Sequence, residues 1–212
     1  MTIFFISDTH FGHEAVIGYS HRPFANVEEM DAALIRNWNS RVTPADTIYH
    51  LGDFCFAKRE RCEALLRQLN GHKFLIAGNH DDTGRKAKGW AWVGDMKELR
   101  VEVQPPSCDA PPETGIPPGE PPPRATQKLV LCHYAMRVWH GSHKGVVQLH
   151  GHSHGSLGPL NLAGYSGNSQ QTDVGVDCWG YRPVTFEEIE ERLRQLPPYH
   201  YPDHHQPRGD AE

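Results

Sequence analysis

The sequence lacks the cysteine patterns that mark a disulfide framework or a thiolate metal site. Its cysteines are odd in number, and no two of them have C-x-x-C spacing. Small secreted domains normally carry an even set, and structural zinc sites normally use closely spaced pairs. Reduced thiols are therefore expected, which is typical of a cytoplasmic protein. The cysteines are Cys55, Cys62, Cys108, Cys132 and Cys178.

Long apolar segments are also missing. Crossing a bilayer as a helix takes about 20 consecutive apolar residues, and no stretch of the sequence approaches this. The apolar run near the N-terminus has no basic lead-in and soon reaches Asp8, unlike a secretory signal. We therefore expect no membrane association.

Positive charge is not in excess. The sequence has 21 Lys and Arg against 26 Asp and Glu, a formal net charge of −5. Proteins that hold long duplex nucleic acid need a basic surface, so such a partner is not expected. Small anionic substrates remain possible, because bound metal ions can make a local site positive.

Polar side chains follow five short apolar segments, each of which is predicted to be a strand. One buried histidine usually satisfies a core hydrogen bond, but five such endings in one chain are hard to explain by packing. We therefore expect these side chains to meet at one end of the strands. The segments are 3–6, 48–51, 74–77, 128–132 and 146–150, and the side chains that follow them are Asp8, His10, Asp53, Asn79, His80, His133, His152 and His154.

Two of these endings contain ligand-type residues at alternate positions. Asp8 and His10 are two residues apart, as are His152 and His154. In an extended chain, side chains at i and i+2 point the same way, so one ion could meet both Asp8 and His10, and the rings of His152 and His154 could both approach one site.

Helices alternate with the first strands. Asn26 is a predicted N-cap for a helix over 27–40, and a second amphipathic helix is predicted over 58–69, where Asn70 and Gly71 end it. This alternation predicts an α/β sandwich with right-handed crossovers. Further strands are expected at 98–103 and 172–177, and a last helix capped by Thr185 is expected to run to about residue 196.

The length of 212 residues fits one domain, which we place at 1–198. A proline-rich loop insertion is predicted at 104–125, and 199–212 is expected to be a polar tail. The insertion contains nine prolines, which forbid regular structure and favour extended chain. We interpret it as a flexible insertion, with binding of a proline-reading protein partner as the alternative.

The ligand types point to a metal centre. Asp8, His10, Asp53, Asn79, His133, His152 and His154 offer hard oxygens and imidazole nitrogens without a thiolate. Such ligands suit Mn²⁺, Fe, Zn²⁺ or Ni²⁺. Seven ligands exceed the need of one ion but match two ions that share a carboxylate. Paired ions lower the pKa of a bridging water and clamp the oxygens of an in-line displacement, which predicts hydrolysis of a phosphoester.

The ordered motifs resemble those of the calcineurin-like metallophosphoesterases. They are Asp8-x-His10, Gly52-Asp53, Gly78-Asn79-His80-Asp81, His133 and Gly151-His152-x-His154. The stretches 7–13, 21–24 and 133–137 are similar to a group of small bacterial and phage predicted phosphoesterases. This resemblance implies a four-layer sandwich of two mixed β-sheets flanked by helices.

The resemblance also implies a role for each motif residue. Asp8, His10 and His154 would hold one metal ion, Asn79, His133 and His152 would hold the other, and Asp53 would bridge them. Two divalent ions are implied, with Mn²⁺ expected before Fe, Zn²⁺, Ni²⁺ or Mg²⁺. A bridging hydroxide would attack, and His80 would assist the leaving group while Asp81 or Asp82 orients its ring.

Substrate contacts are harder to predict from the residues. Our candidates are Arg22, Arg137, His140 and His143, although each of the two histidines is equally well explained as a surface residue. We expect a phosphodiesterase that acts on a small phosphoester or nucleotide. The alternatives are a phosphomonoesterase and a non-catalytic metal-binding scaffold of the same fold.

Overall fold

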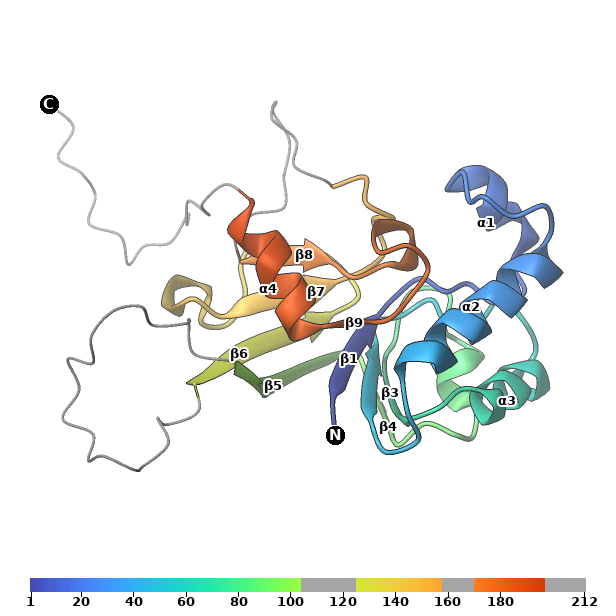
Figure 1. The fold of residues 1–212 in the computed structure, drawn as a ribbon, viewed down its shortest axis with the longest axis horizontal. Helices are drawn as coiled ribbons and strands as arrows, with labels where there is room; N and C mark the ends of the chain where they lie inside the picture. Colours follow the sequence, from blue (N-terminus) through green and yellow to red (C-terminus); the bar gives the residue numbers. More distant parts are fainter. Residues whose placement is uncertain (104–124, 158–169, 197–212) are drawn as a thin grey trace, which may run out of the picture.

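The first sheet contains the strands that were predicted to alternate with helices along the chain. The computed structural model describes residues 1–103, 125–157 and 170–196 (Figure 1). Its first sheet has the order β4-β3-β2-β1-β9, in which only β9 is antiparallel to its neighbour. These strands are β1 (Ile3–Ile6), β2 (Thr47–His50), β3 (His72–Ile76), β4 (Trp92–Gly94) and β9 (Val184–Thr185).

The second sheet has the order β5-β6-β7-β8. Strands β5 and β6 are antiparallel, whereas β7 is parallel to both β6 and β8. Apart from Ala125, which begins β6, the predicted insertion at 104–125 lies outside the described residues, as does the predicted tail at 199–212. The strands are β5 (Met96–Val103), β6 (Ala125–Cys132), β7 (Val147–His150) and β8 (Gln171–Asp173).

The predicted last strand over 172–177 was too long. Strand β8 ends at Asp173, and the short 3-10 helix η3 (Val176–Cys178) follows it. The Asp173 carboxylate accepts a hydrogen bond from the Gly175 N–H at 2.6 Å. A side chain that bonds its own backbone two residues on favours a turn over a strand, so the chain bends at this point.

The helices largely match the sequence-based expectations. They are α1 (Glu14–Tyr19), α2 (Val27–Arg41), α3 (Arg59–Gln68) and α4 (Phe186–Arg194), with 3-10 turns η1 (Gly84–Lys86) and η2 (Ser142–Lys144). The Asn26 side chain accepts a hydrogen bond from Glu29 N at 2.9 Å, so its predicted role as the N-cap of α2 is confirmed. Thr185 and Glu188 form a capping box on α4.

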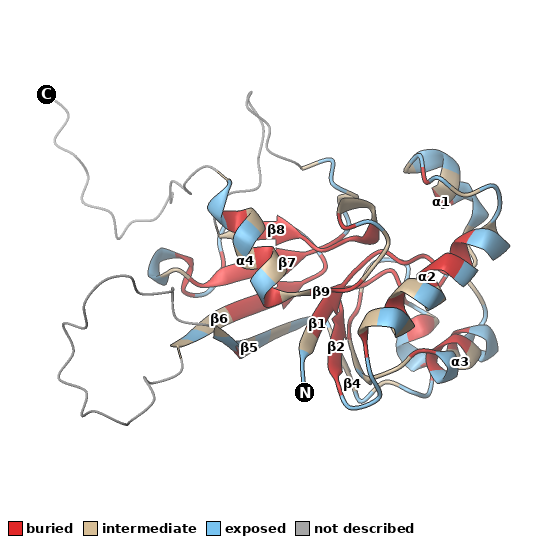
Figure 2. Cartoon of the chain, in the orientation of Figure 1, coloured by how far each residue is buried: buried red, intermediate tan, exposed pale blue. Residues whose placement is uncertain are grey.

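Alternate residues of β1 face different cores, and Figure 2 shows this strand buried along most of its length. Phe4 and Ile6 pack in the cluster that includes residues of α2 and α3, whereas Phe5 packs between the two sheets. Residues Phe186 and Ile189 of α4 belong to the same inter-sheet core. The predicted α/β fold of two mixed sheets with helices is therefore confirmed. Among the described residues, no helix combines the length and hydropathy needed to span a bilayer.

The two sheets are joined beyond the end of β1. Ser7 donates its N–H to Val174 O at 3.1 Å, and Val176 donates its N–H to Ser7 O at 3.0 Å. This short parallel connection draws the chain that follows β1 against the chain that follows β8. The polar residues that follow the strands of both sheets consequently lie close together.

We predict that Asp46 stabilises the turn between α2 and β2. Its carboxylate accepts hydrogen bonds from the Thr43 hydroxyl at 2.6 Å, from Thr2 N at 2.7 Å and from Thr43 N at 2.9 Å. These bonds lower the pKa of Asp46 from 3.8 to about 2. Replacing Asp46 by alanine should lower the free energy of unfolding by about 2 kcal/mol at neutral pH, as measured by urea denaturation.

The pH dependence of that loss follows from the direction of the shift. Because the folded-state pKa is the lower one, the stabilisation is complete above the unfolded-state value and disappears as the pH falls toward about 2. The gap between wild type and Asp46→Ala should therefore narrow below about pH 4. Asp95→Ala, which removes an exposed carboxylate, serves as the control. A gap that stays constant with pH would contradict this account.

Candidate metal centre

The loops that carry the predicted ligands have an unusual backbone. Five of these residues have left-handed φ values: Asp8 (56°), His10 (50°), Asp53 (58°), His152 (66°) and His154 (48°). The extended conformation predicted for the two i, i+2 pairs was therefore wrong. Tight turns place these side chains instead, because backbone bonds such as Asp8 N to Gly52 O and His10 N to Asp53 O, both 3.0 Å, hold the loop after β1 against the loop after β2.

Two glycines permit this close packing. Gly52 has a φ of +100°, and a Cβ at this position would collide with Nδ1 of His133. A Cβ at Gly151 would collide with the side chains of Ser7 and Asp8. At both positions a side chain would clash with a residue of the ligand loops, so only glycine allows the backbone to pass this close to the predicted ligands.

One ligand group contains Asp8, His10 and His154, whose ligand atoms all lie within 4.8 Å of one another. Oδ1 of Asp8 is 3.9 Å from Nε2 of His10 and 4.0 Å from Nε2 of His154. The three residues come from loops after β1 and β7, which belong to different sheets. They are the three residues predicted to hold the first ion.

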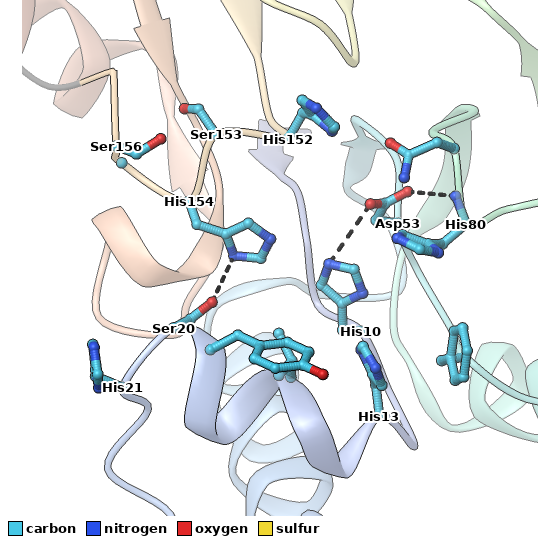
Figure 3. A pocket seen from close by; sticks show the side chains of 15 residues that line it. His10, His13, Ser20, His21, Asp53, His80, His152, Ser153, His154 and Ser156 are labelled. Atoms are coloured by element: carbon cyan, nitrogen blue, oxygen red, sulfur yellow. Dashed lines mark hydrogen bonds and ion pairs between the residues drawn. The ribbon is translucent and has the colours of Figure 1, made fainter.

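The second group contains Asp53, His133 and His152, again within 4.8 Å. The Asn79 side-chain oxygen is 3.2 Å from Nε2 of His133. Oδ2 of Asp53 lies 3.6 Å from Nε2 of His10 (Figure 3) and 3.5 Å from Nε2 of His133. Asp53 thus faces both groups, as the predicted bridging ligand should. Metal binding by these seven residues stays a prediction.

The residues of both groups fit a pair of cations. Nε2 of His10 is buried and has no hydrogen-bond partner among the described residues. Burial lowers the pKa of His10 to about 3, so its imidazole is neutral and keeps a free lone pair. Burial, followed by repulsion from Asp173, raises the pKa of Asp8 to about 7. A cation between these groups would stabilise the ionised carboxylate and occupy the free imidazole nitrogen.

Contacts on the far side of the imidazoles orient them. Nδ1 of His133 bonds to Leu51 O at 2.7 Å, and Nδ1 of His154 bonds to Oδ2 of Asp177 at 2.7 Å. Each bond leaves Nε2 directed toward the carboxylates, which is the usual arrangement of metal-ligating histidines. Asp177 was not predicted from the sequence, where nothing links it to a histidine 23 residues earlier.

Arg22 was predicted to contact the substrate, but it is buried and does not line the cavity above the ligand groups. Its side chain is only 4% exposed and forms a two-pronged ion pair with Asp177, both distances being 2.9 Å. Nη2, which takes part in that pair, also donates to the carbonyl of Asp8 at 2.7 Å, and Nη1 donates to the carbonyl of Thr9 at 3.1 Å. The guanidinium therefore supports the loop after β1 and the partner of His154.

The predicted role of Asp81 in orienting the His80 ring is not supported by its contacts. The buried Asp81 carboxylate accepts hydrogen bonds from the backbone N–H groups of Asp53, Phe54 and Gly78 at 2.7, 3.0 and 2.9 Å. It fastens the loop after β2 to the loop after β3. Asp81 is thus a structural residue, because both of its oxygens serve backbone donors.

A cavity of about 780 Å³ lies over the two groups. None of the other predicted substrate contacts lines it: Arg137 and His143 do not, and the exposed His140 is bonded to Glu98 at 2.7 Å. The described part of the wall contains residues that sequence reasoning missed. They are His13, Val16, Tyr19, Ser20, His21, Phe56, Ser153, Gly155 and Ser156.

Two mixed sheets with two adjacent ligand groups at their strand ends define a metallophosphoesterase type of protein. Comparison of sequences identifies the family, since the family described as calcineurin-like phosphoesterase matches residues 1–105. Together with the fold and the ordered ligand motifs, this match shows that the chain belongs to the calcineurin-like phosphoesterases.

Several other proteins are similar to this chain in sequence or fold. An uncharacterized protein of Methanocaldococcus jannaschii is 50% identical over 86 residues, which are 40% of this chain and 49% of that protein. The Gene 66 protein of Mycobacterium phage L5 is 29% identical over a match that includes 91% of this chain and 94% of the phage protein. A protein of unknown function from Aquifex aeolicus shares the fold, with a TM-score of 0.58, 22% identity and coverage of 90% of this chain and 98% of its own.

We predict that replacement of Asp53 by asparagine disrupts both ion sites. The wild-type chain should bind two Mn²⁺ ions, and Asp53→Asn should weaken binding by at least about tenfold, because the shared negative charge is lost. Equilibrium dialysis with elemental analysis measures the bound ions. The control is Asp95→Asn, which changes an exposed carboxylate in the same way. Unchanged uptake of two ions by Asp53→Asn would contradict the shared site.

We also predict that Arg22→Met is mainly destabilising. The exchange leaves the Asp177 carboxylate, whose side chain is 8% exposed, without its guanidinium partner, and breaking such a largely buried ion pair typically costs about 3 kcal/mol or more of unfolding free energy. Urea denaturation should show this loss, whereas Arg67→Met at an exposed position of α3 should change stability by less than about 0.5 kcal/mol. Normal stability with weakened substrate binding would instead support the original substrate-contact prediction.

Proposed function

We propose that this protein is a phosphodiesterase that depends on two divalent cations, with Mn²⁺ as the first candidate. The observation that carries the proposal is the position of Asp53, whose Oδ2 atom lies 3.6 Å from His10 Nε2 and 3.5 Å from His133 Nε2. A carboxylate shared in this way is the arrangement that two neighbouring ions require. The substrate would be a small phosphoester or nucleotide.

In the proposed reaction, residues of the two ligand groups bind the cations, and backbone N–H groups orient the carboxylates. When bound, the two cations supply an activated water and neutralise charge on the phosphate oxygens. Asp8, His10 and His154 would hold one ion, and Asn79, His133 and His152 would hold the other. The backbone N–H groups of His152 and His80 donate to the carboxylates of Asp8 and Asp53 at 3.0 and 2.9 Å, which fixes the carboxylate orientations.

His80 is placed to assist the leaving group. It is exposed and lines the cavity, and its ring centroid is 5.6 Å from that of His10. Its backbone is tied to Oδ1 of Asp53, so the ring is held beside the shared carboxylate. From there the imidazole would donate a proton to the departing oxygen, a role that typically contributes about 10²-fold or more to the rate.

The charge of the cavity favours a diester over a monoester. No Lys or Arg is present among its described lining residues. A phosphate monoester carries more negative charge than a diester and gains more from additional cationic contacts. A wall without fixed positive charge therefore suits a diester, whose single charge the two cations would neutralise.

We expect His80→Ala to lower kcat by about 10²-fold on bis(p-nitrophenyl) phosphate, because the leaving oxygen loses its proton donor. The measurement compares Mn²⁺-dependent turnover of this diester with turnover of the monoester p-nitrophenyl phosphate. The control is His72→Ala, which removes an exposed histidine outside the cavity. Metal content should match wild type in both variants.

Two other outcomes would redirect the assignment. Turnover of the monoester alone would support a phosphomonoesterase. Intact metal binding without hydrolysis of any phosphoester tested would support a binding scaffold of the same fold.

We also retain the expectation of a cytoplasmic protein without long duplex nucleic acid or membrane partners. The free thiols of Cys55, Cys62, Cys132 and Cys178 fit a reducing compartment.

A further inference from the structure

Exposed aromatic side chains stand at the mouth of the cavity. Tyr19 is 78% exposed and Phe56 is 52% exposed, and both line the cavity above the ligand groups. Large apolar side chains that gather in the open beside a site commonly mark a binding surface. Neither residue belongs to the metal-binding motifs, so the mechanism proposed above leaves them without a role.

His13 and Phe56 form a stacked pair. Their ring centroids are 4.4 Å apart with an interplanar angle of 29°, and the edge of Tyr19 approaches His13 at 6.4 Å. We call His13, Tyr19 and Phe56 the aromatic wall. Phe56 N donates to Phe11 O at 2.8 Å, and this bond ties together the loops that carry the two stacked rings. The pair is therefore held in place by backbone contacts and does not depend on a ligand.

The aromatic wall lies directly beside the proposed reaction centre. The His13 ring is 5.5 Å from His10 and 6.4 Å from His80, and the Phe56 ring is 5.8 Å from His80. A group attached to a phosphate bound over His10 would thus reach the wall on the side of the proposed proton donor.

We propose that the aromatic wall binds a planar aromatic substituent of the phosphoester, with a nucleobase as the chemical class that it fits best. Aromatic side chains stack on every base because each base has a π-face. The described lining has no Lys or Arg for additional phosphates. The ligand is therefore a single-phosphate nucleotide ester and not a polyphosphate. This inference rests on the proposed function, since it specifies the substrate of the same site.

The test compares two ligands that share a phosphate and differ in the base. Adenosine 5′-monophosphate and methyl phosphate are titrated into the Mn²⁺-loaded protein by calorimetry. Wild type should bind the nucleotide at least about fivefold more tightly, and Phe56→Leu should remove most of that preference while its affinity for methyl phosphate stays within about twofold of wild type. Phe56→Tyr, which keeps a ring, should retain the preference.

Met96→Leu provides the matched control, because Met96 is also 52% exposed but lies outside the cavity. With bis(p-nitrophenyl) phosphate, Phe56→Leu should raise KM by at least about fivefold and leave kcat within about twofold of wild type. Equal affinity of wild type for the two ligands would overturn the proposal. The proposal would also be overturned if Phe56→Leu lost affinity equally for adenosine 5′-monophosphate and methyl phosphate, or if its affinities for both were unchanged.

The outcome separates this inference from the proposed function. If turnover depends on Mn²⁺ and His80 but Phe56→Leu keeps the nucleotide preference, the aromatic wall is refuted and the phosphodiesterase stands. If no ester is hydrolysed but the preference depends on Phe56, the nucleotide site stands and the proposed reaction fails.

Discussion

The structure depends on two carboxylates that are buried among imidazoles, and no Lys or Arg among the described residues is bonded to either of them. Asp8 and Asp53 are almost fully buried, and their oxygens face His10, His133 and His154. Backbone N–H groups orient both carboxylates but cannot neutralise them. Ionised groups are costly to bury unless they are paired or bind cations. Two divalent ions, as proposed above, would resolve this conflict, and the rest of the local structure holds the candidate ligand groups in position.

Those positions are maintained by conformations which the chain would not adopt alone. A non-glycine residue in a left-handed conformation costs of the order of 1 kcal/mol or more, and the ligand loops contain five of them. The surrounding core and ladder bonds compensate for this cost. Arg22 contributes by joining the carbonyl of Asp8 to the carboxylate of Asp177, which in turn orients His154. A buried ion pair thus links the loop after β1 to a ligand from the other sheet.

Much of this could be predicted from short-range patterns. The apolar runs predicted most of the strands, and the N-caps Asn26 and Thr185 predicted where two helices begin. The polar residues that follow the strands predicted the members of both ligand groups. The predicted roles of Arg22 and Asp81 differ from their contacts because those contacts span long sequence separations. Arg22 meets Asp177 across 155 residues, and Asp81 meets Asp53 across 28. Arg22 and Asp81 lie in loops beside predicted site residues, so their sequence context suggested function, whereas burial by distant elements makes them structural.

In the proposed reaction, substrate recognition and catalysis would use different kinds of side chain. Within the described cavity wall, positive charge for the phosphate can come only from bound cations, because no guanidinium or ammonium group lines it. Cations attract any phosphate in much the same way, so they cannot distinguish one ester from another. Discrimination must then come from neutral surfaces that contact the rest of the substrate. His13 and Phe56 offer such a surface, and the backbone bond between Phe11 and Phe56 fixes its position relative to His10. The proposed selectivity by stacking would thus use the two loops, after β1 and after β2, that also carry Asp8, His10 and Asp53.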